Sequence, residues 1–178
     1  TCPNKDGTKG YGGCIYCSKL GSGDFAGNKE KDLITQFNEV KEIMKKKWPD
    51  ALYIGYFQAN TNTYAKTEVL KQKYEPILEL ENVIGLNIAT RPDAITEDCL
   101  DYLEELSTRT YLTVELGLQT IHEKTTKLIN RGHDLECFTN MVKELRKRNI
   151  NVVVHIINGL PYETKEMMLE TVEYLNKL

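Results

Sequence analysis

The strongest constraint on the fold is a regular alternation of short apolar segments with amphipathic ones. Four segments have the length and composition of buried strands, and each is followed by a helical pattern; they are residues 51–57, 83–89, 110–118 and 150–158. Such alternation predicts a parallel sheet covered by helices. A sheet of this kind is either open or closed into a barrel, and in both forms ligands bind at the carboxyl ends of the strands.

The helical segments follow from apolar residues at helical spacing. They are expected at residues 33–48, around Leu70, and at 96–106, 122–130, 135–149 and 165–178. Proline punctuates two of them: Pro49 is expected to end the first, and the second is expected to end before Pro76. The order is therefore a loop and a helix, followed by strand–helix units.

Length and composition fit one soluble globular domain. The chain has 178 residues, of which 40% are hydrophobic and 28% charged, with a net charge of −3. No apolar run approaches the roughly eighteen residues that cross a membrane, so we expect no membrane association and a cytoplasmic location. The charge gives no global signal for nucleic-acid binding. Because the chain begins at Thr1 and stops within a helical pattern at Leu178, we expect both ends of the native protein to be missing.

A cysteine cluster opens the chain in the stretch TCPNKDGTKGYGGCIYC. Cys2, Cys14 and Cys17 lie there, with four glycines between the first two. A closed zinc site needs four ligands, whereas three thiolates suit a [4Fe–4S] cluster whose fourth iron keeps a free position. The residues favour iron–sulfur but leave three functions open: a cluster enzyme, a zinc-stabilised binding module, and an iron–sulfur electron-transfer protein.

Polar motifs follow the predicted strands. They read QANTNTY, TRPD, ELGLQT and NGLP. Because the carboxyl ends of parallel strands share one edge, these motifs are expected to meet there, beside the cysteine loop.

The cysteine loop followed by (βα) repeats resembles the radical S-adenosylmethionine (SAM) superfamily. The motifs ATRPD, VELGLQT, INRGHD and INGLPYET resemble the branch that contains the catalytic subunit of Elongator. The cysteine stretch and GSGDFAG are similar to bacterial YhcC/YtqA-like proteins, which include MnmL-type tRNA-modifying enzymes. One departure is the spacing of the first two cysteines, eleven residues here against three in most of the superfamily.

The resemblance implies a fold, cofactors and ligands for them. The fold would be α/β, a partial (β/α)6 TIM-like barrel with parallel strands and outer helices. Residues 1–178 would be its core domain, without its first strand and C-terminal part. Cys2, Cys14 and Cys17 would be the metal ligands of a [4Fe–4S] cluster, with S-adenosyl-L-methionine on its open iron.

The residues expected to contact SAM come first from the cysteine loop and the first strand end. Tyr16 would lie near the adenine, with simple loop packing as the alternative. Gln58 and Asn60 occupy the place of a Gly-Gly-Glu motif that accepts from the SAM amino group, and Thr61 follows them. Thr61 and its neighbour Thr63 could instead be helix N-caps.

Further SAM contacts are expected from the later motifs. Arg91 could bind a carboxylate or phosphate, with an ion pair to Asp93 as the alternative. Gln119 would bind the ribose hydroxyls and Glu115 would support the site, the alternative being that both satisfy backbone groups.

The resemblance makes Arg131 the partner of the SAM carboxylate. His155 would lie near the ribose or substrate, although a satisfied core histidine is the default. Leu160 would give the adenine an apolar floor. The implied reaction converts a carboxymethylaminomethyl group on a tRNA wobble uridine to an aminomethyl group by way of a 5′-deoxyadenosyl radical, with flavodoxin or ferredoxin as electron donor; another substrate within the enzyme class stays open.

Overall fold

A computed structural model describes residues 1–23 and 26–178. Asp24 and Phe25, which belong to the GSGDFAG motif, lie outside the described residues. Within the described part, no helix is long and apolar enough to cross a membrane.

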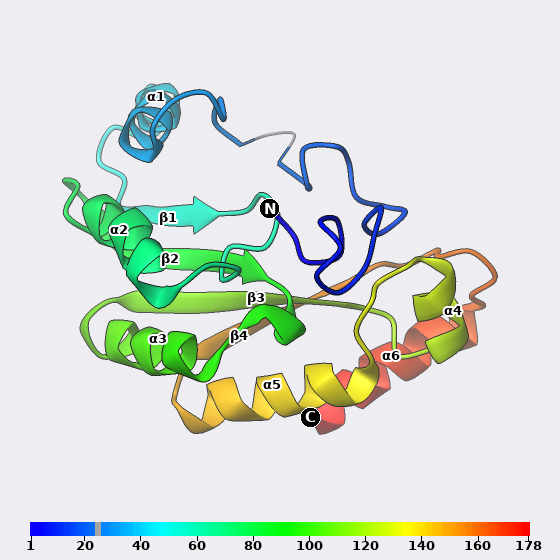
Figure 1. Cartoon of the computed structure of the whole chain (residues 1–178). Helices are drawn as coiled ribbons and strands as arrows, with labels where there is room; N and C mark the ends of the chain where they lie inside the picture. The colour runs from blue at the N-terminus through cyan, green and yellow to red at the C-terminus, as the bar shows by residue number, and fades with distance from the viewer. Residues whose placement is uncertain (24–25) are drawn as a thin grey trace.

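Four parallel strands form a single sheet in sequence order (Figure 1). They are β1 (Tyr53–Phe57), β2 (Val83–Thr90), β3 (Tyr111–Gln119) and β4 (Asn151–Ile156). This confirms the predicted α/β architecture of parallel strands with connecting helices. In the residues that the structure describes, the sheet does not close, and β1 and β4 are its edges.

In the described part of the chain, six α-helices and one short 3-10 helix connect and flank the strands. They are α1 (Leu33–Lys45), α2 (Thr67–Leu78), η1 (Pro92–Ala94), α3 (Glu97–Arg109), α4 (Glu123–Leu128), α5 (Leu135–Lys147) and α6 (Lys165–Lys177). Side chains of Asp32, Thr96, Asp134 and Thr164 accept from backbone N–H groups in the first turns of α1, α3, α5 and α6. These caps explain where the four helices begin, because the first N–H groups of a helix have no partner within it.

The expected end of the second helix before Pro76 is wrong. Helix α2 continues through Pro76 to Leu78 and buries Ile77 beyond it. Proline removes a single intrahelical hydrogen bond, and burial of Tyr74 and Ile77 on the same helix favours continuation. Helix α1 ends at Lys45, earlier than expected, so that Trp48 lies outside it and is half exposed.

The hydrophobic core lies between one face of the sheet and helices α2, α3 and α5. Strand β3 contributes alternate residues, among them Leu112, Val114 and Leu116, and α3 contributes Leu103 and Leu106. The alternation arises because successive side chains of a strand point to opposite faces.

The opposite face of the sheet is more polar and has no helix over it in the described part. Tyr56, Asn87, Glu115 and His155 stand on this face, which we call the open face. The chain's N-terminal segment lies across the carboxyl ends of the strands (Figure 1).

Replacing Leu103 with alanine should lower the free energy of unfolding by about 3 kcal/mol, because the side chain is fully buried and a cavity would remain. Urea unfolding followed by circular dichroism measures this. Leu169→Ala, on the half-exposed side of α6, is the matched control and should change stability by about 0.5 kcal/mol or less. Equal losses in the two variants would contradict this account of the core.

Candidate active site

The cysteine segment is tied by its backbone to the loop after β1. The N–H of Asn60 donates to the carbonyl of Gly21 at 2.8 Å, and the N–H of Thr61 donates to that of Thr1 at 3.2 Å. Asn60 has a φ of 66°, a left-handed conformation that asparagine tolerates. The loop that the sequence predicted to contact SAM therefore directly supports the cysteine segment.

A second set of contacts ties the same segment to the turn after α4. The N–H of Ile15 donates to Ile129 O at 3.0 Å, and Asn130 Nδ2 donates to the carbonyls of Tyr11 and Gly13 at 3.0 and 2.8 Å. Backbone groups that would otherwise be unpaired are thereby satisfied in a loop without regular structure. The INRGHD motif, far along the chain, holds the glycine-rich part of the cysteine loop.

The three thiols lie in this segment and are partly exposed. Asn4 Nδ2 lies 3.6 Å from Cys14 Sγ, and Cys17 Sγ lies 3.8 Å from Ser22 Oγ. Among the described residues, no three His, Cys, Asp or Glu side chains are grouped as a metal site. The assignment of Cys2, Cys14 and Cys17 as cluster ligands stays a prediction.

Tyr16 stands between two of these thiols in sequence and is 38% exposed. Burial of its hydroxyl, followed by the neighbouring Cys14 thiol, raises the pKa of Tyr16. The phenol is therefore a neutral donor at physiological pH, and its contact with an adenine stays a prediction.

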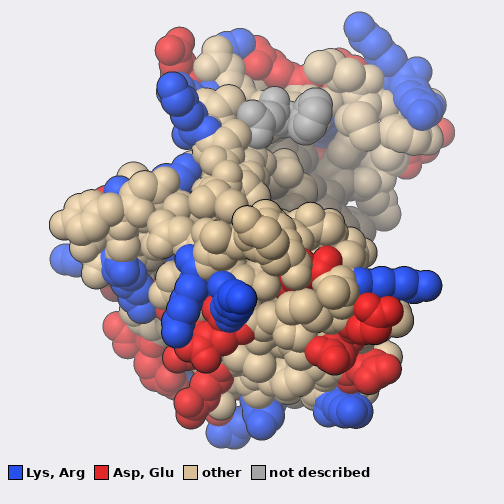
Figure 2. All heavy atoms as spheres, turned by 90° about the vertical axis from the view of Figure 1, so that its right-hand side faces the viewer, with Lys and Arg blue, Asp and Glu red and all other residues tan. Residues whose placement is uncertain are grey.

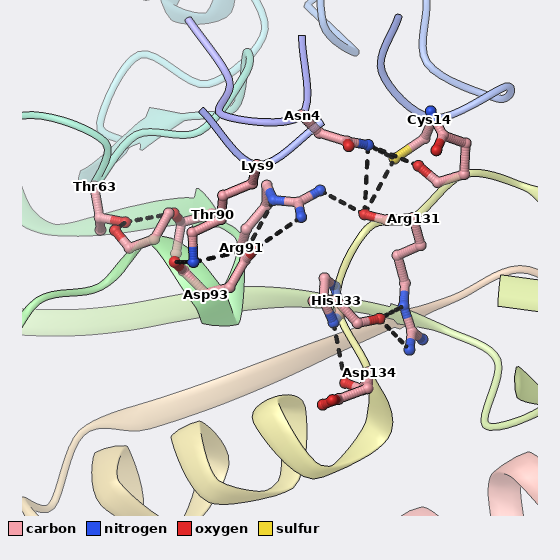
Figure 3. A network of polar contacts seen from close by, with 12 residues as sticks. Asn4, Lys9, Cys14, Thr63, Thr90, Arg91, Asp93, Arg131, His133 and Asp134 are labelled. Carbon is pink, nitrogen blue, oxygen red and sulfur yellow. Dashed lines mark hydrogen bonds and ion pairs between the residues drawn. The ribbon is translucent and has the colours of Figure 1, made fainter. Parts of the chain in front are cut away.

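Arg91 binds Asp93 through both arms of its guanidinium (Figure 3). Its Nε and Nη2 lie 2.9 Å from the two carboxylate oxygens, and its Nη1 donates to Arg131 O at 2.7 Å. Lys9 donates to Asp93 O at 2.6 Å. The alternative reading of Arg91, an ion pair with Asp93, is thus confirmed. Burial alone would raise the pKa of Asp93, but the hydrogen bonds and charge of Arg91 outweigh it and hold that pKa below its usual value.

Arg131 is 1% exposed, and its donors point to backbone carbonyls. Nη1 donates to Thr120 O at 2.8 Å and also to Leu118 O, while Nε and Nη2 donate to His133 O at 3.0 and 2.9 Å. The side chain joins the end of β3 to the turn before α5. This geometry does not favour the predicted partnership with a SAM carboxylate, which stays a prediction.

The residues after β1 are not helix N-caps. The N-cap of α2 is Lys66, and Thr63 Oγ1 instead contacts Thr90 Oγ1 at 2.6 Å and donates to Ala94 O at 2.7 Å. Thr61 Oγ1 is buried and has no partner among the residues that the structure describes. Gln58 lines a cavity of about 480 Å³ between α1 and β1.

Gln119 ends β3 with a φ of 60° and folds its side chain back over Gly117. A Cβ on Gly117 would lie 2.3 Å from Gln119 Nε2, so a larger residue there would require the Gln119 amide to move. Gln119 Oε1 is buried and has no hydrogen-bond partner within residues 1–23 and 26–178. Since this oxygen accepts no hydrogen bond there, the alternative that the Gln119 side chain satisfies nearby backbone groups is not supported.

Glu115 is 7% exposed and binds two side chains on the open face. Tyr56 OH donates to Glu115 Oε2 at 2.8 Å, and His155 Nε2 lies 2.8 Å from the same oxygen. Sequence reasoning missed Tyr56, although strand alternation would have placed it on the open face. His155 is not a buried core histidine, since its side chain is 51% exposed. Leu160, expected as an apolar floor, is 6% exposed in the loop after β4.

The carboxyl edge contains buried acceptors that lack partners in the part of the chain described by the structure. They are Asn4 Oδ1, Thr61 Oγ1 and Gln119 Oε1. Burying a polar atom without a hydrogen bond is costly, so these oxygens are suited to a ligand that donates. An ammonium and two ribose hydroxyls, as in SAM, supply such donors, and the residues present therefore fit that cofactor.

The sequence profile of the radical SAM superfamily matches residues 8–175. The chain belongs to the radical SAM superfamily. Members of this superfamily bind a [4Fe–4S] cluster and S-adenosylmethionine. The matched residues contain Cys14 and Cys17, whereas Cys2 precedes them.

Individual relatives support this assignment. The chain is 59% identical to YtqA of Bacillus subtilis, over 96% of this chain and 53% of YtqA, and 38% identical to YhcC of Escherichia coli, over 97% of this chain and 55% of YhcC. It thus spans about half the length of both relatives. A tRNA uridine(34) acetyltransferase of Methanocaldococcus infernus is 34% identical over 47% of this chain and 15% of its own length.

A solved structure supports the fold. The radical SAM enzyme coproporphyrinogen III oxidase (HemN) of Escherichia coli superposes with a TM-score of 0.55 at 22% identity, covering 68% of this chain and 28% of the enzyme. At this identity the similarity concerns the fold, which is that of a radical SAM partial barrel.

Replacing Asp93 with asparagine should lower the free energy of unfolding by about 3 kcal/mol at pH 7, because Arg91 would keep a buried charge without its carboxylate. The pKa of Asp93 is lowered in the folded state, so its contribution is present above the usual carboxyl pKa of 3.8 and disappears as the pH falls through the lower folded value. The difference between wild type and variant should therefore shrink in acid. Urea unfolding between pH 7 and pH 2.5 measures it, with Asp50→Asn on an exposed turn as control; a difference independent of pH would contradict the ion pair.

Proposed function

We propose that this chain is the radical SAM core of a tRNA-modifying enzyme that converts a carboxymethylaminomethyl group on the wobble uridine to an aminomethyl group. The single observation that carries the proposal is the meeting of the cysteine segment with partnerless buried acceptors at the carboxyl edge, in a chain of this superfamily.

In this proposal Cys2, Cys14 and Cys17 hold the [4Fe–4S] cluster. Asn60, Thr61 and Gln119 accept hydrogen bonds from SAM. When bound, the cluster and SAM supply a carbon radical that removes a hydrogen atom from the substrate.

The other residues of the edge act by holding this arrangement in place. Arg91 and Arg131 carry fixed positive charge beside the cysteine segment, and their donors are already committed to Asp93 and to backbone carbonyls. The segment's backbone contacts with the β1 loop and with Asn130 limit its movement. Rigid placement is what radical chemistry requires, because an ill-placed radical reacts with the protein or solvent.

The tRNA part rests on the resemblance to MnmL-type enzymes and on the relative named as a tRNA uridine(34) acetyltransferase. Figure 2 views the side toward which the strands point, and positive and negative side chains are interspersed around a mostly uncharged centre. RNA binding by this face would therefore depend less on a continuous basic surface than on recognition of a single modified base. A small electron carrier such as flavodoxin or ferredoxin would supply the reducing electron.

Anaerobic reconstitution of the protein with iron and sulfide should give a brown cluster, and reduction in the presence of SAM should yield 5′-deoxyadenosine. Cys14→Ala should lower the yield by about a hundredfold or more, because one cluster ligand is lost. Cys137→Ala, half-buried in the first turn of α5, is the matched control and should retain the yield. A colourless zinc protein would support the binding module, and a redox-active cluster without SAM cleavage would support electron transfer.

Deletion of the gene in a cell that uses this modification should leave carboxymethylaminomethyl uridine in its tRNA and deplete the aminomethyl form. Mass spectrometry of the nucleosides from purified tRNA measures both. Complementation with wild type should restore the pattern and complementation with Cys14→Ala should not. Unchanged wobble uridines would contradict the proposed tRNA substrate. They would not bear on SAM cleavage, which the 5′-deoxyadenosine measurement tests separately.

A further inference from the structure

Three side chains from three strands converge on the open face, below the carboxyl edge. Glu115 on β3 receives Tyr56 from β1 and His155 from β4, both at 2.8 Å on the same carboxylate oxygen. Glu115 lies four residues before Gln119, which is about 13 Å along an extended strand. We call Tyr56, Glu115 and His155 the face cluster.

In the part of the chain that the structure describes, the Glu115 carboxyl group has no permanently charged cation as a partner. Glu115 is 7% exposed, and its one ion pair among the described residues is with His155, which is charged only when protonated. Burial and the hydrogen bond to Glu115 raise the pKa of Tyr56 to about 12, so the phenol is a neutral donor. A largely buried carboxylate is expensive to keep ionised unless a cation compensates it.

A ligand would reach the carboxylate from the open face, where two members of the face cluster are half exposed. Ala89, a small residue on β2, is the register partner of Glu115, and Gly117, which the Gln119 amide covers, is the register partner of His155. Tyr56 is 47% exposed and the His155 side chain 51% exposed, so the cluster opens away from the core. Asn87, on the same face, has a buried side-chain oxygen without a partner in the described part.

We propose that the face cluster binds a protonated amine of the substrate, with Glu115 as its counter-ion. A dialkylammonium offers a positive charge and two N–H donors. The dialkylammonium would donate one hydrogen bond to the charged Glu115 carboxylate and one to the neutral Asn87 side-chain oxygen. The inference rests on the proposed function, because the carboxymethylaminomethyl group contains such a secondary amine. It makes Glu115 a specificity-determining residue for the substrate, distinct from the SAM contacts at the strand ends.

The test compares two RNA stem-loops that carry the wobble substituent, one with the secondary amine and one with an ether oxygen in its place. Fluorescence anisotropy measures their affinities for the reconstituted protein with SAM bound and no reductant, so that no turnover occurs. Wild type should bind the amine about tenfold or more tightly than the ether. Glu115→Gln keeps the shape and removes the charge, and should abolish this preference while changing affinity for the ether by less than about twofold.

Val153→Thr is the matched control, since Val153 is the register partner of Glu115 on β4 and faces the same side. It should keep the preference for the amine. Wild type that binds both RNAs equally, or neither, overturns the inference, as does a Glu115→Gln protein that keeps the preference. The comparison of the two RNAs on wild type does not depend on the variant, so the inference can be tested even if Glu115→Gln misfolds. Failure of the proposed function has a different signature, namely no 5′-deoxyadenosine from wild type on reduction.

Discussion

The hydrogen-bonded pairing of Arg91 with Asp93 and with the carbonyl of Arg131 is the interaction on which the carboxyl edge depends. It joins the end of β2 to the turn after α4, two segments forty residues apart in the chain. That turn in turn holds the cysteine segment through Ile129 and Asn130. A buried guanidinium needs several acceptors at fixed positions, so the pair defines where the turn must lie.

The two faces of the sheet have different roles in the protein. One face packs apolar side chains such as Leu86, Val114 and Leu116 against the helices and supplies stability. The other carries Glu115, whose burial is costly, and its half-exposed partners Tyr56 and His155. Strand β3 supplies residues to both faces, because its neighbouring side chains point to opposite sides of the sheet. Stability and chemistry are therefore specified by interleaved positions of the same segment.

The sequence predicts the architecture well because period and composition act locally. The apolar strands and the leucine face of α3 needed no tertiary information, and the superfamily motifs marked the strand ends. Tertiary packing decided the rest. Helix α2 continues beyond Pro76 because Ile77 is buried, and the Arg131 guanidinium donates to backbone carbonyls and not to a ligand. Tyr56 was missed because a tyrosine in an apolar strand gives no local sign of the distant carboxylate that it meets.

Gln119 and Gly117 lie between the strand ends and the face cluster on the open face. The amide of Gln119 rests where any side chain on residue 117 would stand, and Gly117 is in register with His155 of the face cluster. A molecule that draws this amide toward the strand ends would vacate the space above Gly117. The position of this one amide therefore links the strand ends to the part of the open face beside His155.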